Sequence, residues 1–122
     1  MQVPMLQAKI HRATVTDANL HYEGSITIDR RLMDLAGLLA YQQVQVYNVS
    51  TGARFETYII EGDPGSGCIC INGAAAHLAG TGDIVIIAAY VGVPAEAART
   101  WRPRNVYVDA ANRPLPQRAA AE

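Results

Sequence analysis

The pair Gly24-Ser25 places a hydroxyl directly after a glycine carbonyl, at the start of an apolar stretch. A serine oxygen can attack the carbonyl of the preceding residue and convert that peptide bond into an ester, which breaks more easily than an amide. Elimination would release Gly24 as a carboxylate and leave a dehydroalanine at position 25, which hydrolyses to a pyruvoyl group. Such a ketone is a built-in electrophile. Taken alone, however, glycine followed by a small polar residue usually marks a turn.

Two cations and a phenol add to this chemistry. Arg54 can bind a carboxylate through two parallel N–H donors, and Lys9 is the only lysine of the chain. On an extended strand over 54–60, side chains alternate between faces, so Arg54 and Tyr58 share one face. A phenol is a weak acid suited to protonating a basic carbon. A substrate with two carboxylates would fit two cations.

The order and spacing of the motifs resemble a known family. Besides Gly24-Ser25, the matching motifs are Lys9-Ile10-His11-Arg12, Arg54, Thr57-Tyr58, the segments 72–77 and 82–87, and Thr100-Trp101-Arg102-Pro103. They resemble the aspartate 1-decarboxylases, small bacterial pyruvoyl enzymes that make β-alanine for pantothenate. The resemblance covers about 5–108. It implies a small, closed, six-stranded double-psi β-barrel with short helices, assembled as a homotetramer with its sites at subunit boundaries.

The resemblance also implies a role for each matching residue. Ser25 is the cleavage nucleophile that becomes the pyruvoyl group and forms a Schiff base with L-aspartate. Gly24 supplies the carbonyl and the freedom to adopt a strained backbone. Thr57 stabilises the oxyanion and Tyr58 donates the proton. The implied substrate-binding residues are Lys9, His11, Tyr22, Arg54, Thr57, Asn72, Gly73, Ala74 and Ala75. Neither pyridoxal phosphate nor a metal is expected, and a maturation factor could be required for cleavage.

Composition limits the other classes of function. A chain of 122 residues is the size of one domain, and its net charge of -1 gives no reason to expect nucleic acid or an anionic membrane as a partner. Cys68 and Cys70 lie two apart in an apolar run, which favours buried thiols over a disulfide or a zinc site. The sequence contains neither a signal-peptide pattern nor an apolar run long enough to span a membrane, so we expect a cytoplasmic protein.

Short apolar runs between glycine-rich turns predict many strands and little helix. We expect a bent strand over 5–15, a turn at 16–19 and extended chain over 20–28. Asp29 should cap a short helix whose apolar face comprises Leu32, Leu35, Ala36 and Leu39. Further strands are expected at 44–49, 54–60, 68–71, 84–91 (buried on both faces) and 105–108, with one helical turn at 95–99. The barrel domain should be 1–108, and 109–122 a disordered or loosely packed tail.

Two alternatives remain open at this stage. The chain could be an uncleaved barrel that acts as a non-enzymatic binding module and shares only the scaffold with the enzymes. It could also be a pyruvoyl decarboxylase that acts on another amino acid, although Arg54 and Lys9 together favour a diacid.

Overall fold

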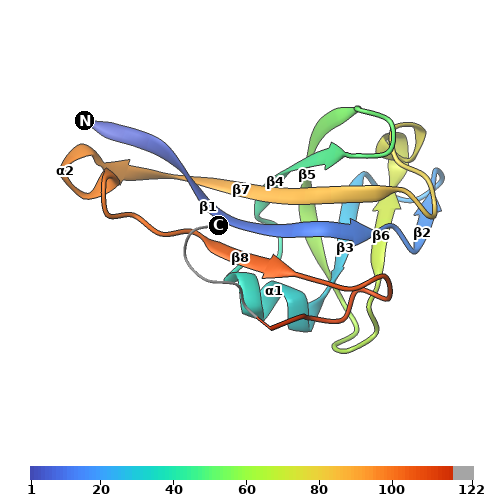
Figure 1. The fold of residues 1–122 in the computed structure, drawn as a ribbon. Coiled ribbons are helices and arrows are strands. Elements are labelled where there is room, and N and C mark those ends of the chain that lie inside the picture. The colour runs from blue at the N-terminus through green and yellow to red at the C-terminus, as the bar shows by residue number, and fades with distance from the viewer. Residues whose placement is uncertain (117–122) are drawn as a thin grey trace.

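The computed structural model describes residues 1–116 (Figure 1). This part of the chain contains eight strands, two short α-helices and one 3-10 helix. The strands are β1 (Gln2–Thr14), β2 (Asp17–Asn19), β3 (Ser25–Asp29), β4 (Gln43–Asn48), β5 (Arg54–Gly62), β6 (Ile69–Asn72), β7 (Ile84–Pro94) and β8 (Arg104–Tyr107). The helices are α1 (Arg30–Ala36), α2 (Ala95–Ala98) and the 3-10 helix η1 (Gly73–His77). The predicted mainly β class with short helices is confirmed.

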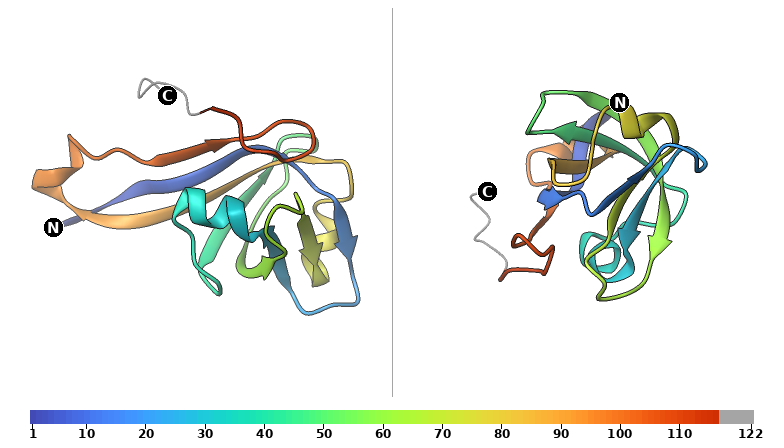
Figure 2. Two further views of the ribbon diagram at one scale, coloured as in Figure 1. Left: turned by 90° about the horizontal axis from the view of Figure 1, so that it is seen from below. Right: turned by 90° about the vertical axis from the view of Figure 1, so that its right-hand side faces the viewer.

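The sheet curls round on itself because its two ends belong to one continuous stretch of chain. The hydrogen-bonded order is β2-β6-β3-β5-β4-β7-β1-β8, so β1 and β2 lie near opposite ends although only Val15 and Thr16 separate them in sequence. Thr16 N–H donates to the carbonyl of Ile69 in β6 at 2.8 Å. Figure 2 shows the resulting curvature. The arrangement fits the predicted six-stranded barrel, with β2 and β8 as additions at the two ends of the sheet.

The longest pairing joins β1 to β7, and it is interrupted within the strand that the sequence predicted to be bent. The register shifts between Ile10 and Ala13, and Arg12 has a positive φ of 60°, as expected for a bulge. The two-face burial predicted for 84–91 holds only for part of β7. Val85, Ile87, Ala88 and Ala89 are buried, but Tyr90 is 49% exposed because the end of β7 leaves the barrel.

Helix α1 begins after the predicted cap, but it ends at Ala36, before the predicted Leu39, and it buries only part of the predicted apolar face. The Asp29 carboxylate accepts from Arg31 N–H, and Gly37 ends the helix in the left-handed conformation with a φ of 71°. Leu35 and Leu39 are exposed, so the predicted apolar face is wrong at these two residues. The residues that α1 buries are Leu32, Met33 and Ala36.

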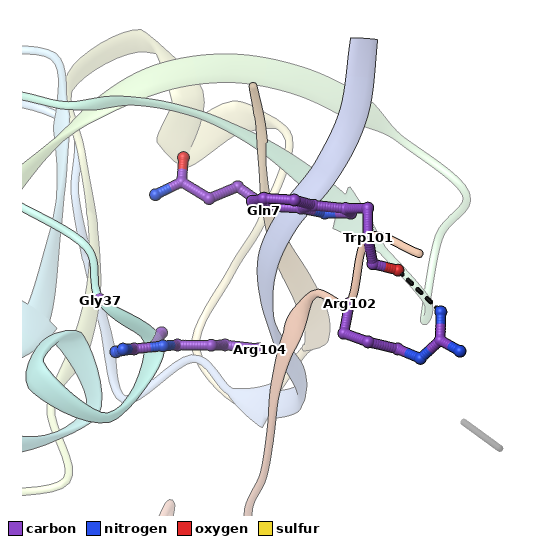
Figure 3. Close-up of a pocket in the computed structure, with 6 residues that line it drawn as sticks. Gln7, Gly37, Trp101, Arg102 and Arg104 are labelled. Atoms are coloured by element: carbon purple, nitrogen blue, oxygen red, sulfur yellow. Dashed lines mark hydrogen bonds between the residues drawn. The ribbon is translucent and has the colours of Figure 1, made fainter. Parts of the chain in front are cut away.

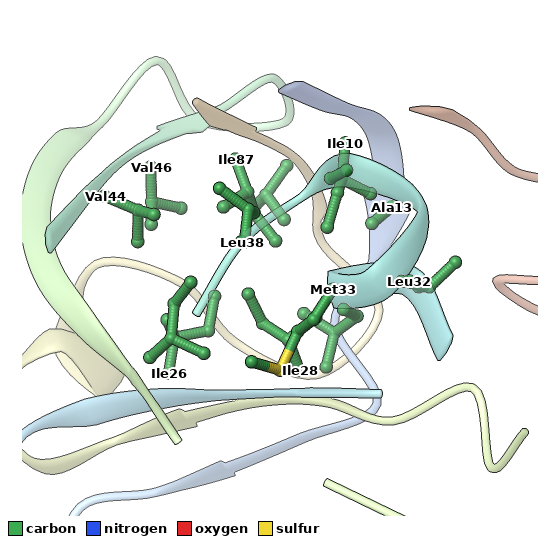
Figure 4. Packing of buried hydrophobic residues seen from close by; sticks show 14 of the residues in the cluster. Ile10, Ala13, Ile26, Ile28, Leu32, Met33, Leu38, Val44, Val46 and Ile87 are labelled. Atoms are coloured by element: carbon green, nitrogen blue, oxygen red, sulfur yellow. The ribbon is translucent and has the colours of Figure 1, made fainter. Parts of the chain in front are cut away.

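The barrel interior is filled by aliphatic side chains from every strand of the wall, with α1 closing one side (Figure 4). Its largest fully buried members are Ile10, Ile26, Ile28, Leu32, Met33, Ile59, Ile69, Ile71, Ile87, Val15, Val44 and Val46. Because these residues alternate along their strands, the residues between them form the outer face of the sheet.

Three further expectations need correction. Residues 16–24 are not a turn followed by a strand: 17–19 form β2 and 20–24 form the turn. Cys68 and Cys70 are half-buried free thiols. The segment 109–116 is held in place rather than loosely packed, because the buried Asn112 side chain donates to Thr14 O and Gly67 O, each at 2.8 Å. The remainder of the predicted tail, 117–122, lies outside the described residues.

Candidate active site

The Ser25 side chain is fully buried at the start of β3 and is held between two polar partners. Its hydroxyl donates to the carbonyl of Glu23 at 3.1 Å and accepts from the Asn72 side-chain amide at 3.0 Å. The same amide donates to the Thr27 hydroxyl at 3.1 Å. Ser25 and Asn72 are direct cross-strand partners of the antiparallel pair β3 and β6. The hydroxyl is therefore folded back toward the chain that precedes it.

The backbone of Gly73 lies directly against that of Gly24. Gly73 has a φ of 73°, and a Cβ added there would lie 2.6 Å from Gly24 Cα and 3.1 Å from Tyr22 O. Gly24 itself is not among the glycines with positive φ, and a Cβ added to it would meet open space. The predicted conformational freedom is thus needed at Gly73, whereas no strain is found at Gly24 in this intact chain.

Thr57 and Tyr58 lie on the strand next to the Gly24-Ser25 step. Strands β3 and β5 run parallel with Ile26 opposite Ile59, so one step back along both strands brings Ser25 beside Tyr58. Thr57 precedes Tyr58 on β5, and Gly24 immediately precedes β3. Within residues 1–116, no hydrogen bond engages the Thr57 hydroxyl. The Tyr58 ring stacks on that of Tyr41, with centroids 6.4 Å apart.

Arg54 lies at the start of β5, on the outer face that also carries Tyr58. Its guanidinium carbon lies 4.0 Å from the centroid of the Tyr47 ring. Glu56, on the same face, is engaged elsewhere: Gln43 and Gln45 donate to its carboxylate at 2.6 and 2.9 Å. No ion pair of Arg54 is found within residues 1–116. The guanidinium is consequently available to an external carboxylate.

Lys9 and His11 lie on β1, away from the residues that surround Ser25. Lys9 is opposite Ala88 of β7 and Asn105 of β8, and no ion pair of Lys9 is found in the described chain. His11 packs edge-on against Tyr107 at 5.5 Å and lines a cavity of about 280 Å³ beside β8. The folded chain therefore gathers only some of the predicted site residues, namely Tyr22, Gly24, Ser25, Thr57, Tyr58, Asn72 and Gly73. Ala74 and Ala75 follow in η1, with Ala75 packed against the core.

Sequence reasoning missed the aromatic neighbours of this site, Tyr41, Tyr47 and Tyr90. One signal was present, because the strands predicted at 44–49 and 54–60 can pair as a hairpin, and this pairing sets Tyr47 opposite Arg54. Tyr41 and Tyr90 meet their partners only through the tertiary fold. In addition, the sequence assigned Asn72 to substrate binding and gave no indication that its amide would contact Ser25.

Another cavity, of about 290 Å³, lies away from this site (Figure 3). It is lined by Gln7, Ala36, Gly37, Trp101, Arg102 and Arg104. The Trp101 indole N–H donates to Leu6 O at 2.7 Å, so this side chain packs against β1. Among residues 1–116, no group of His, Cys, Asp and Glu could hold a metal ion, and no helix is long and apolar enough to cross a bilayer.

The fold and the site together define a small β-barrel with a buried serine after glycine. Lys9 and Arg54 lie on its outer face, and neither forms an ion pair within residues 1–116. The sequence model of the aspartate decarboxylase family matches residues 1–115. The aspartate 1-decarboxylase of Syntrophotalea carbinolica is 55% identical over 119 residues, covering 98% of this chain and 91% of that protein. The aspartate 1-decarboxylases of Syntrophus aciditrophicus and Thermoanaerobacter pseudethanolicus are 59% and 56% identical, covering 92% and 94% of this chain and 97% and 98% of those proteins. The chain belongs to the aspartate decarboxylase family, whose double-psi barrel is the predicted fold.

Proposed function

We propose that this protein is a self-processing carboxy-lyase that converts L-aspartate to β-alanine and carbon dioxide. The observation that carries the proposal is the buried Ser25 hydroxyl, held beside the Gly24 peptide by Glu23 O and the Asn72 amide. A turn serine would be expected at the surface. The relatives described above, each named aspartate 1-decarboxylase, support the same activity.

Self-cleavage begins when Ser25 Oγ attacks the Gly24 carbonyl carbon and the peptide nitrogen takes up a proton, which leaves an ester. Elimination across Cα–Cβ of residue 25 releases the Gly24 carboxylate, and water then replaces the nitrogen, which leaves as ammonia. The attack creates an oxyanion on the Gly24 oxygen, and such a charge needs an aimed donor. The unengaged Thr57 hydroxyl on the adjacent strand is our candidate. Asn72 keeps the nucleophile in place.

The site fits a pyruvoyl group at position 25, because cleavage after Gly24 leaves residue 25 at the start of β3, still buried and facing Asn72. When formed, this ketone supplies an electron sink for loss of the α-carboxylate. Tyr58, beside residue 25 in the parallel register, holds the proton that the product carbon needs. The small residues 73–75 leave room for the substrate next to the cleavage step.

Arg54 and Lys9 would bind the two carboxylates of the substrate. Both side chains lack an acidic partner within residues 1–116, and Glu56 is kept from Arg54 by two glutamine donors. An amino acid with one carboxylate would leave one cation without a ligand. This pairing supports aspartate over amino acids with uncharged side chains.

We infer that a second copy of the chain completes the site. One row of direct partners crosses the sheet from Lys9 through Ala88 and Gln45 to Glu56. Lys9 and the face of β5 are therefore three strand spacings apart. At about 4.8 Å per spacing this is roughly 14 Å, longer than an aspartate molecule. A homotetramer with its sites at subunit boundaries would bring Lys9 of one copy to Ser25 of another.

The first test is the intact mass of the denatured protein, followed by an assay for β-alanine. We expect two chains that separate between Gly24 and Ser25, the larger one without a free amine and reactive toward a carbonyl reagent. Ser25→Ala should abolish cleavage and activity together, whereas Tyr58→Phe should still cleave but decarboxylate poorly.

A single 13.1 kDa chain that stays whole even with added cell extract would contradict the proposal and favour an uncleaved binding module. Cleavage that appears only with the extract would instead indicate a maturation factor. Turnover of another amino acid in preference to aspartate would correct the substrate alone.

A further inference from the structure

A chain of contacts crosses three strands of the outer face and ends on Arg54. The Arg54 guanidinium lies over the Tyr47 ring, and the Tyr47 hydroxyl is 2.8 Å from the Tyr90 hydroxyl. Tyr47 and Arg54 are direct partners of β4 and β5, whereas Tyr90 belongs to β7 on the other side of β4. The direct partner of Tyr47 on β7 is Ile86, so the two phenols reach toward each other along the sheet.

We propose that Tyr90 is a positioning residue for Arg54, and that it acts through Tyr47. By holding the Tyr47 hydroxyl, Tyr90 fixes the ring on which the guanidinium rests and so directs the N–H edge of Arg54 toward a substrate carboxylate. This inference rests on the proposed function and deepens it, because it names a residue that determines how the diacid is bound.

The geometry of stacking explains why such a support is useful. A guanidinium that lies on an aromatic ring uses its flat face, and its five N–H donors remain free in the plane for bidentate binding. Arg54 and Tyr90 are both exposed, so without the stack the arginine would sample many rotamers and lose more entropy on binding. The Tyr47–Tyr90 hydrogen bond limits that freedom before the substrate arrives.

The charges around the pair agree with this arrangement. The hydrogen bond with Tyr47 and partial burial raise the pKa of Tyr90, while the positive charge of Arg54 acts in the opposite direction. Tyr90 therefore keeps its proton at neutral pH and can take part in the hydrogen bond. Glu56, the acid that shares this face, is held by Gln43 and Gln45 and does not draw Arg54 away from the ring.

The test is a double-mutant cycle on the processed enzyme. Tyr90→Phe and Tyr47→Phe each remove one hydroxyl and keep the ring, so each should raise KM for aspartate about three- to tenfold, the usual effect of one neutral hydrogen bond. The value of kcat should stay within about twofold, because the chemistry at residue 25 is untouched. The double variant should be no worse than either single one.

Arg54→Lys supplies the matched background, because an ammonium cannot stack as a plane on Tyr47. In this background Tyr90→Phe should leave KM nearly unchanged. An unchanged KM for Tyr90→Phe in otherwise native enzyme, or an equal rise in the Arg54→Lys background, would overturn the inference while the proposed function stands. A native protein that never cleaves or decarboxylates aspartate would remove both. The extent of self-cleavage and the melting temperature of each variant separate these results from misfolding.

Discussion

Gly73 and Asn72 contact the Gly24-Ser25 step from one side. Gly73 has a φ of 73°, and any Cβ there would collide with Gly24 Cα at 2.6 Å. Asn72, immediately before it, is 5% exposed and divides its amide between the hydroxyls of Ser25 and Thr27. Because Gly73 contacts the Gly24 backbone and Asn72 holds the Ser25 hydroxyl, a small shift of these two residues would move both atoms that the proposed cleavage joins.

Gly73→Ala should therefore impair self-cleavage more than it impairs folding. A left-handed alanine costs about 1–2 kcal/mol of stability, and displacing the Gly24 backbone by about 1 Å can cost about 100-fold in rate. The measurement is the fraction of split chain over time by intact mass, with the melting temperature measured in parallel.

Gly52→Ala is the matched control for this change. Gly52 also has a positive φ, 84°, but a Cβ added there meets nothing within 4 Å. It should reproduce the stability cost and leave cleavage at the native rate. If the two variants cleaved equally fast, the contact between Gly73 and Gly24 would have no part in processing.

At the scale of elements, β3 is short but fixed at both ends. Ser25, at its start, is hydrogen-bonded to Asn72. Asp29, at its end, is 3% exposed. Its carboxylate accepts three backbone N–H groups, from Arg31, Gly65 and Gly67, at 2.8 to 2.9 Å. One side chain thus caps α1 and closes the loop before β6. Both neighbours of β3 in the sheet, β5 and β6, carry site residues, so this anchoring aligns the site.

Asp29→Ala should destabilise the fold by about 3 kcal/mol, because it removes an N-cap and leaves two further amides without their charged acceptor. Asp34→Ala is the control: its exposed carboxylate pairs with Arg30 one turn earlier in α1, a type of contact that contributes little to stability because water screens it. Denaturant unfolding of both variants, in a Ser25→Ala background that excludes cleavage, measures the difference. Similar losses for the two would mean that Asp29 serves as an ordinary cap only.

The elements also show what the sequence could and could not predict. Asp29 begins α1 as predicted, because a cap depends on local chemistry, which a sequence displays. The burial of Met33 in place of Leu35 depends on where the sheet lies, and the helix alone does not contain that information. Asn112 bonds to Thr14 across 98 positions, so no local pattern could predict that 109–116 would be packed. Likewise, the sequence predicted an unusual backbone at Gly24, whereas the glycine with a positive φ and no room for a Cβ is Gly73.

At the scale of the whole molecule, the site residues form two groups. One group lies on three neighbouring strands, with Asn72 on β6, Ser25 on β3 and Tyr58 on β5. Lys9 lies across the outer face on β1. Within one chain the row from Lys9 to Glu56 spans three strand spacings, about 14 Å. A shared site would reconcile the two groups, since symmetric oligomers commonly build sites from surfaces of different copies.

Mixed assemblies test this arrangement directly. Ser25→Ala and Lys9→Ala should each be nearly inactive alone at low aspartate concentration, but co-expression should restore activity, because some sites then combine a native Ser25 from one copy with a native Lys9 from another. Random 1:1 assembly would give about one native site in four.

Co-expression of Ser25→Ala with Tyr58→Phe is the control, and it should restore nothing because the register sets Tyr58 beside Ser25 of the same chain. Activity from differently tagged subunits, purified through both tags, gives the readout. If the Ser25→Ala and Lys9→Ala mixture stayed inactive, Lys9 would have to act within its own chain, and the 14 Å row would need to close by a movement of β1.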